Sequence, residues 1–163
     1  MPTIGSYSIM RDMPHASRAL RLLQHVAHLV KPIMRRHGYY IPRLEEFYRQ
    51  DFLGLTESVV SYRGVKTVTV VKLTLRDHRD PYRFQPIGQI IETFLHELTH
   101  QRFGPHDKRF WRQQQIHRDE FAHMYGLPDG WNVQYEDHDG NGRPKYSGRY
   151  ENWPGWSQVP FLY

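Results

Sequence analysis

The run HELTHQRFGPH, residues 96–106, constrains this chain more than any other stretch. On a helix, His96 and His100 lie on the same face, because they are four residues apart. Two imidazoles so placed can bind one zinc ion. A Gly-Pro pair then ends the helix, so that the chain can turn and bring His106 back as a third ligand. Three protein ligands leave one position of a tetrahedral zinc for water, which is the catalytic arrangement.

The helix that carries this run is expected over residues 86–103, and it is amphipathic. Its apolar side chains fall on one arc: Ile87, Ile90, Ile91, Phe94, Leu95 and Leu98. His96 and His100 point to the opposite side, and Glu97 lies at the boundary between the two faces. The helix is therefore predicted to bury one face and to present its histidines to a cleft.

Glu97 is the candidate catalytic residue. Zinc lowers the pKa of a bound water toward ~7, so that Glu97 can take the proton of that water. The hydroxide attacks a peptide carbonyl, and Glu97 delivers the proton to the leaving amine. The donor that stabilises the oxyanion stays open among Arg109, Tyr125 and a tyrosine of the C-terminal segment. The pattern predicts a zinc metallopeptidase with one catalytic zinc ion.

Composition narrows the chemistry of any site. The 163 residues include no cysteine, so a metal must be bound by histidines and carboxylates. The N-terminal stretch has no apolar core of the kind a signal peptide needs, and no apolar run approaches ~18 residues, so an intracellular protein without a membrane span is expected. The net charge of +5 suits an anionic partner such as nucleic acid, and it equally suits a solvated basic surface.

Three segments are expected along the chain. Residues 1–12 are predicted to be a flexible arm, and residues 13–126 a metalloprotease domain. Residues 127–163 are rich in Gly, Pro and aromatic side chains, and they are predicted to be a tail that packs on the domain or extends from it. Its aromatic side chains favour packing against the domain over stacking on nucleobases.

The expected fold is α+β, a small zincin-like domain with a twisted, mostly antiparallel sheet. Helical periodicity predicts an N-terminal helix over residues 13–37, which Pro32 kinks or shortens by its last turn. A hairpin is expected within residues 59–75, with Arg-Gly at its turn. A polar loop is expected over residues 77–85, and a further helix over residues 106–125.

Several other motifs have ordinary structural explanations. Three of them are rejected as metal sites, because they lack ligand spacing or a needed carboxylate: His25, His28 and His37; His117 and His123; and the calcium-loop-like residues 137–142. The Val-x-Val-Val run at residues 68–71 resembles a strand that docks on SUMO, and a strand of the core is the favoured interpretation.

The run HELTHQRFGPHDKRFW resembles the active site of the WLM metalloproteases, a family related to the SprT/Spartan proteases. Two upstream stretches, VKPIMRRHGYYIPRLEEFY and KLTLR, are also similar, so the resemblance covers about residues 17–121. It implies a zincin fold, with zinc on His96, His100 and His106 and with Glu97 as catalyst. It also implies a nuclear protease, activated by single-stranded DNA, that cleaves proteins crosslinked to DNA and is linked to SUMO or ubiquitin.

Two alternatives to this function stay open. The first is a zinc peptidase with no dependence on DNA. The second is a non-catalytic binding module that zinc only stabilises. The presence of Glu97 argues against the second alternative, because a purely structural zinc site has no use for a carboxylate beside its histidines.

Overall fold

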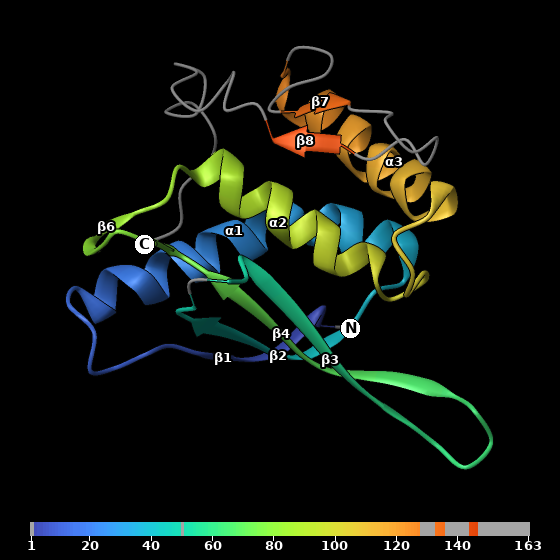
Figure 1. The fold of residues 1–163 in the computed structure, drawn as a ribbon, viewed down its shortest axis with the longest axis horizontal. Helices are drawn as coiled ribbons and strands as arrows, with labels where there is room; N and C mark the ends of the chain where they lie inside the picture. The colour runs from blue at the N-terminus through green and yellow to red at the C-terminus, as the bar shows by residue number, and fades with distance from the viewer. Residues whose placement is uncertain (1, 50, 128–132, 136–143, 147–163) are drawn as a thin grey trace. The chain divides into compact units, whose positions relative to one another are not determined.

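The computed structural model describes residues 2–49, 51–127, 133–135 and 144–146, which divide into two compact units between Gln85 and Pro86. The first unit holds the elements β1 (Ile4–Ser8), α1 (Ala16–His37), β2 (Ile41–Phe47), β3 (Gly54–Val60), β4 (Lys66–Thr74), β5 (Arg76–Asp77) and β6 (Asp80–Phe84). The second holds α2 (Ile87–Thr99), α3 (Lys108–Tyr125), β7 (Val133–Tyr135) and β8 (Pro144–Tyr146) (Figure 1). These elements confirm the predicted α+β class. No helix in the described ranges has the length and apolar character that a membrane span requires.

The four-stranded sheet of the first unit is mixed, with strand order β1-β2-β4-β3. β1 pairs with β2 in parallel and β2 pairs with β4 in parallel, whereas β3 and β4 are antiparallel. The expectation of a mostly antiparallel sheet is therefore wrong. The reason is that α1 connects β1 to β2 as a crossover, and a crossover connection joins strands that run in the same direction.

Strand β1 also corrects the prediction of a flexible arm at residues 1–12. Ile4 pairs with Ile41 of β2, and Thr3 and Ile4 are both buried. A Cβ atom at Gly5 would lie 2.6 Å from the carbonyl oxygen of Pro42, so this close approach of the two strands requires glycine. The segment lacks the alternation of apolar residues that would have indicated a strand.

Helix α1 begins at Ala16, later than predicted, and it ends at Gly38 as predicted. Gly38 adopts a φ of 70°, and its backbone N–H caps the last carbonyls of the helix. Pro32 lies inside the helix, which continues past it to His37. The last turn is therefore not split off.

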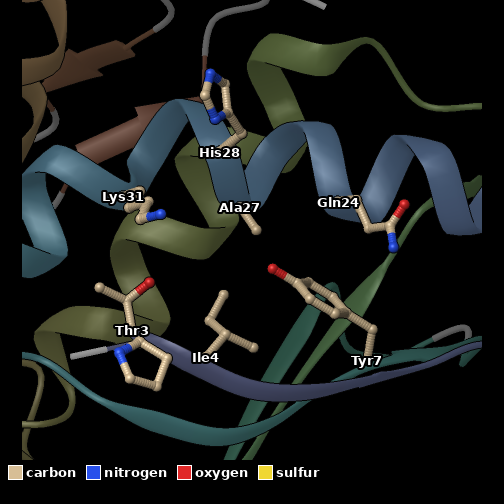
Figure 2. Close-up of a pocket in the computed structure, with 8 residues that line it drawn as sticks. Thr3, Ile4, Tyr7, Gln24, Ala27, His28 and Lys31 are labelled. Atoms are coloured by element: carbon tan, nitrogen blue, oxygen red, sulfur yellow. The ribbon is translucent and has the colours of Figure 1, made fainter. Parts of the chain in front are cut away.

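An open pocket of about 450 Å³ lies between β1 and α1 (Figure 2). Its lining comes from both elements and from the residues that precede β1: Pro2, Thr3, Ile4, Tyr7, Gln24, Ala27, His28 and Lys31. In Figure 2 the Tyr7 ring points from the strand toward the helix. Burial raises the pKa of the Tyr7 hydroxyl above its ordinary value.

The hairpin predicted within residues 59–75 is confirmed as β3 and β4, but its first strand begins at Gly54, five residues earlier than predicted. Its turn contains Gly64, which has a φ of 78°. Strand β4 pairs with β2 along one edge and with β3 along the other. Residues 68–71 therefore lie in a strand of the core sheet, as favoured above, and Val70 and Val71 are paired on both sides.

The polar segment at residues 77–85, predicted to be a loop, contains strand β6, which pairs with β5. Arg76 is buried and holds the segment in place. Its guanidinium donates hydrogen bonds to the carbonyl oxygens of Pro14 and Pro81. Arg76 also forms an ion pair with Glu46 of β2, with 2.8 Å between Nε and Oε2. Two partners of Arg76, Pro14 and Glu46, lie far away in the sequence, so no local pattern indicates how this segment is held.

The predicted tail lies mostly outside the described residues. Its described parts are β7 and β8, which pair antiparallel with Val133 opposite Tyr146. The packing of its aromatic side chains, and the domain boundary after residue 126, stay predictions.

Buried His25 makes the stability of the fold depend on pH. Burial, together with the charge of His28, lowers the pKa of His25 to about 4. A histidine in the unfolded chain has a pKa of about 6.5. The folded state therefore binds fewer protons than the unfolded state below this pH, and it loses stability as the pH falls from 6.5 toward 4. The total loss from this residue is on the order of 3 kcal/mol.

We therefore expect His25→Gln to flatten the decrease in unfolding free energy between pH 7 and pH 5, measured by urea titration. His123→Gln serves as the matched control, because His123 is exposed on α3. An unchanged pH dependence in His25→Gln would contradict the assignment.

Candidate metal centre

Helix α2 buries its apolar arc as predicted, but it ends at Thr99, before the Gly-Pro pair and four residues earlier than predicted. Its fully buried apolar side chains are Ile90, Ile91, Phe94, Leu95 and Leu98. His96, near the end of the helix, and His100, its C-terminal cap residue, are only partly buried. Their backbone is helical at both positions, so the four-residue spacing places both imidazoles on one face.

The third histidine joins these two. Nε2 of His106 lies 3.2 Å from Nε2 of His96 and 3.1 Å from Nε2 of His100. A tetrahedral zinc ion with Zn–N bonds of about 2.0–2.1 Å separates its ligand nitrogens by roughly 3.3 Å. The donor set therefore fits a small divalent cation. Within the described part of the chain, this is the one group of three or more potential ligand residues close enough to share a metal.

The loop before α3 positions His106. Asp107 is the N-cap of α3, and its Oδ1 accepts the backbone N–H groups of Arg109 at 3.0 Å and Phe110 at 3.2 Å. Hydrogen bonding from the Arg109 side chain is the largest cause that holds the pKa of Asp107 below its ordinary value. The cap fixes the start of the helix directly after His106, two residues later than predicted.

Hydrogen bonding and burial leave His100 and His96 each with a ring nitrogen that can bind a metal. Nδ1 of His100 lies 3.2 Å from the backbone carbonyl oxygen of Phe103, which can only accept, so Nδ1 carries the proton and Nε2 carries the lone pair that could bind a metal. Burial is the main cause that lowers the pKa of His96 to about 3, followed by the charges of His100 and His106. His96 is therefore neutral at physiological pH.

Two aromatic side chains of α3 pack against the histidines. The ring centroid of Phe110 lies 4.7–4.8 Å from those of His96, His100 and His106. The Trp111 ring stacks on His106 at 5.4 Å with an interplanar angle of 19°. These contacts restrict the rotation of all three imidazoles. Both aromatic side chains are buried, and no local pattern indicates that their partners are the histidines.

Glu97 lies beside the cluster. It is only 5% exposed, and its Oε2 is 4.0 Å from Nε2 of His96. A water held near the histidine nitrogens would be within reach of this carboxylate.

Two candidates for the oxyanion donor, Arg109 and Tyr125, lie on α3. Arg109 is ion-paired with Asp107 at 3.0 Å, and Tyr125 lies at the end of α3 against Phe121. The side chains of the C-terminal tyrosines lie outside the described residues.

The rejected metal motifs are not brought together. Buried His117 contacts Thr99 Oγ1 at 3.2 Å and Gln113 Nε2 at 3.1 Å, and His25 is buried within α1. His37 stacks on Tyr39. Residues 137–142 lie outside the described residues. The described histidines of these motifs therefore have the ordinary structural roles that the sequence favoured.

Three comparisons identify similar proteins. The model of the WLM domain matches residues 2–151. The DNA-dependent metalloprotease WSS1 of Saccharomyces cerevisiae is 34% identical over 114 residues, which are 69% of this chain and 39% of that protein. A homologue from Schizosaccharomyces pombe is 34% identical over 90 residues, which are 55% of this chain and 30% of that protein.

A solved structure agrees with these relatives. The crystal structure of Wss1 from Saccharomyces cerevisiae superposes with a TM-score of 0.66 at 32% identity, and the match covers 77% of this chain and 95% of the crystallised chain. The chain thus spans less than half the length of the curated relatives, but nearly all of the chain in that crystal.

Proposed function

Because this chain belongs to the WLM domain family, we propose that it is a zinc-dependent endopeptidase that cleaves proteins crosslinked to or bound on DNA. The observation that carries the proposal is the convergence of three imidazole Nε2 atoms with the Glu97 carboxylate beside them. The dependence on DNA is supported by the relatives, which are named DNA-dependent metalloproteases.

The residues divide the chemistry among them. His96, His100 and His106 would hold the zinc ion, which when bound supplies Lewis acidity and lowers the pKa of water toward ~7. Glu97 accepts the proton from the attacking water and returns it to the amine that leaves the cleaved peptide bond. Burial of Glu97 excludes bulk water from around the carboxylate, which keeps this proton transfer local.

Single-stranded DNA separates this proposal from a DNA-independent peptidase. We expect cleavage of a DNA-binding protein by the zinc-loaded chain to be stimulated by single-stranded DNA, and the stimulation to fade with salt. Neutralising about four phosphates would lower the apparent affinity for DNA roughly sevenfold for each doubling of the salt concentration. Equal cleavage with and without DNA, at low salt, would instead support the DNA-independent peptidase.

Two further parts of the proposal are supported by the family resemblance alone. They are a nuclear location and partners linked to SUMO or ubiquitin. Imaging of the tagged protein tests the first, and affinity capture on immobilised SUMO and ubiquitin tests the second. Val70 and Val71 of β4 are already paired with β2 and β3, which argues against this run as the docking strand.

A further inference from the structure

The β3–β4 hairpin ends in an exposed, partly aromatic tip, residues 59–66. β2 pairs with β4 only from Val70 to Thr74, so the hairpin tip extends beyond β2 (Figure 1). Tyr62 in the tip is 92% exposed. Three valines of the tip also have more than half of their surface exposed: Val59, Val60 and Val65. A contiguous exposed group of this kind usually marks a binding site.

Backbone hydrogen bonds hold the hairpin tip in shape without the Tyr62 side chain. The N–H of Ser61 donates to the carbonyl oxygen of Val65, and the N–H of Gly64 donates to the carbonyl oxygen of Ser61, both at 2.9 Å. Ser61 Oγ also accepts the N–H of Val65 at 3.2 Å. The tip is therefore a preformed surface, and a substitution of Tyr62 leaves these hydrogen bonds in place.

The sequence of the hairpin gives its tip a positive charge. Residues 58–76 contain no acidic side chain, and Arg63 and Lys66 are exposed in the tip. The acid that precedes this stretch, Glu57, forms an ion pair with Lys72 at 3.0 Å. Two basic side chains therefore lie within four residues of an exposed aromatic ring. This combination is complementary to an anionic partner that carries planar groups.

Arg63 restrains the Tyr62 ring. Its Nε donates to the Tyr62 hydroxyl at 3.0 Å, and its guanidinium carbon lies 5.4 Å from the ring centroid. This contact uses one N–H of the guanidinium, so the others can reach phosphate oxygens. A ring that is already restrained loses less rotational freedom when another ring stacks on it, which favours binding.

We propose that the hairpin tip is a contact site for single-stranded nucleic acid, in which an unpaired base stacks on the Tyr62 ring while Arg63 and Lys66 bind the flanking phosphates. Aromatic side chains beside basic ones bind single strands in this way, with little preference for sequence. The valines add apolar surface beside the ring. The inference rests on the proposed function, because the relatives are named for their dependence on DNA, and it adds the residues that meet the strand.

Tyr62→Ala removes the stacking ring. We expect this variant to bind a fluorescein-labelled oligothymidine of about 16 nucleotides about 5–150-fold more weakly than the parent, measured by fluorescence anisotropy at low salt. The matched control is Tyr82→Ala in β6, because Tyr82 is also largely exposed but has Asp77 and Asp80 close to it in sequence. Its affinity should stay within about twofold of the parent value. Equal affinities for Tyr62→Ala and the parent, or an equal loss in both variants, would overturn the inference.

Salt dependence and strand type separate stacking from charge. Each phosphate contact on a single strand contributes about 0.7 to the slope of log Kd against log salt concentration. Arg63→Gln should lower this slope by about 0.7, whereas Tyr62→Ala should weaken binding at an unchanged slope. The bases of a duplex are already stacked, so Tyr62→Ala and the parent should bind a duplex of the same length equally. An equal loss of affinity for the duplex would contradict the stack.

Two outcomes distinguish this inference from the proposed function. If binding depends on Tyr62 but the zinc-loaded parent cleaves nothing, with or without DNA, only the proposed function is refuted. If single-stranded DNA binds to Tyr62→Ala and stimulates its proteolysis as in the parent, only this inference is refuted. Binding to neutral lipid vesicles that Tyr62→Ala abolishes, at unchanged affinity for oligothymidine, would assign the hairpin tip to a lipid surface and overturn the proposal.

Discussion

Replacing Glu97 with glutamine is expected to abolish proteolysis while zinc remains bound. Glutamine keeps the size of the side chain, but it cannot accept the proton of the attacking water. General acid–base catalysis contributes about 10²–10⁴-fold to a rate, so kcat should fall by at least that range. The three histidines proposed as ligands are unchanged, and zinc content measured by atomic absorption should equal that of the parent.

A neutralised carboxylate elsewhere on the second unit provides the control. Glu120→Gln makes the same change on α3, outside the histidine cluster, and it should cleave at the parent rate. Full activity in Glu97→Gln would refute the role assigned to this residue. A parent protein that binds zinc but cleaves neither casein nor a DNA-bound protein would support the non-catalytic module.

The candidate site could be predicted because its signals are local. The spacing of His96 and His100 defines a helix face, and the Gly-Pro pair after them lets the chain bring back His106. Each of these features lies within a few turns of one helix and its end. Short-range geometry alone therefore predicts that these three histidines come together, before any tertiary contact is known.

Other buried contacts of the second unit could not be found in this way. Gln114 and Glu92 meet across α2 and α3, and neither interrupts a periodic pattern or matches a motif. The contacts of Phe110 and Trp111 with the histidines depend on how α3 folds back after His106. Polar residues inside helices usually indicate a solvated face, so sequence periodicity misassigns a buried polar cluster.

The sheet was predicted only in part for a related reason. The β3–β4 hairpin has a local signal at Gly64, and it was found. Strand β1 pairs with β2 across the whole of α1, and its short run of small and polar residues gives no alternation. Without β1 no crossover connection is apparent, so the sequence suggested antiparallel pairing.

Replacing Arg76 with methionine is expected to destabilise the fold by about 3–5 kcal/mol, because removing one partner of a buried ion pair leaves the other charge uncompensated. Neither Arg76 nor Glu46 has any exposed side-chain surface. Oε1 of Glu46 also accepts the backbone N–H of Met10 at 2.9 Å, so the pair anchors the segment between β1 and α1. The loss should appear as a lower urea midpoint in circular dichroism of the zinc-loaded protein.

An exposed ion pair of the same type is the control that separates the effect of burial on stability from the effect of losing a charge. Arg49 and Asp51 lie 3.0 Å apart with more than half of each side chain exposed, so Arg49→Met should cost less than about 1 kcal/mol. Adding Glu46→Gln to Arg76→Met removes the buried charge while keeping an acceptor for Met10, and it should recover part of the lost stability. Similar losses for Arg76→Met and Arg49→Met, or no recovery in the double variant, would show that the buried charge of Glu46 does not determine the stability of this unit.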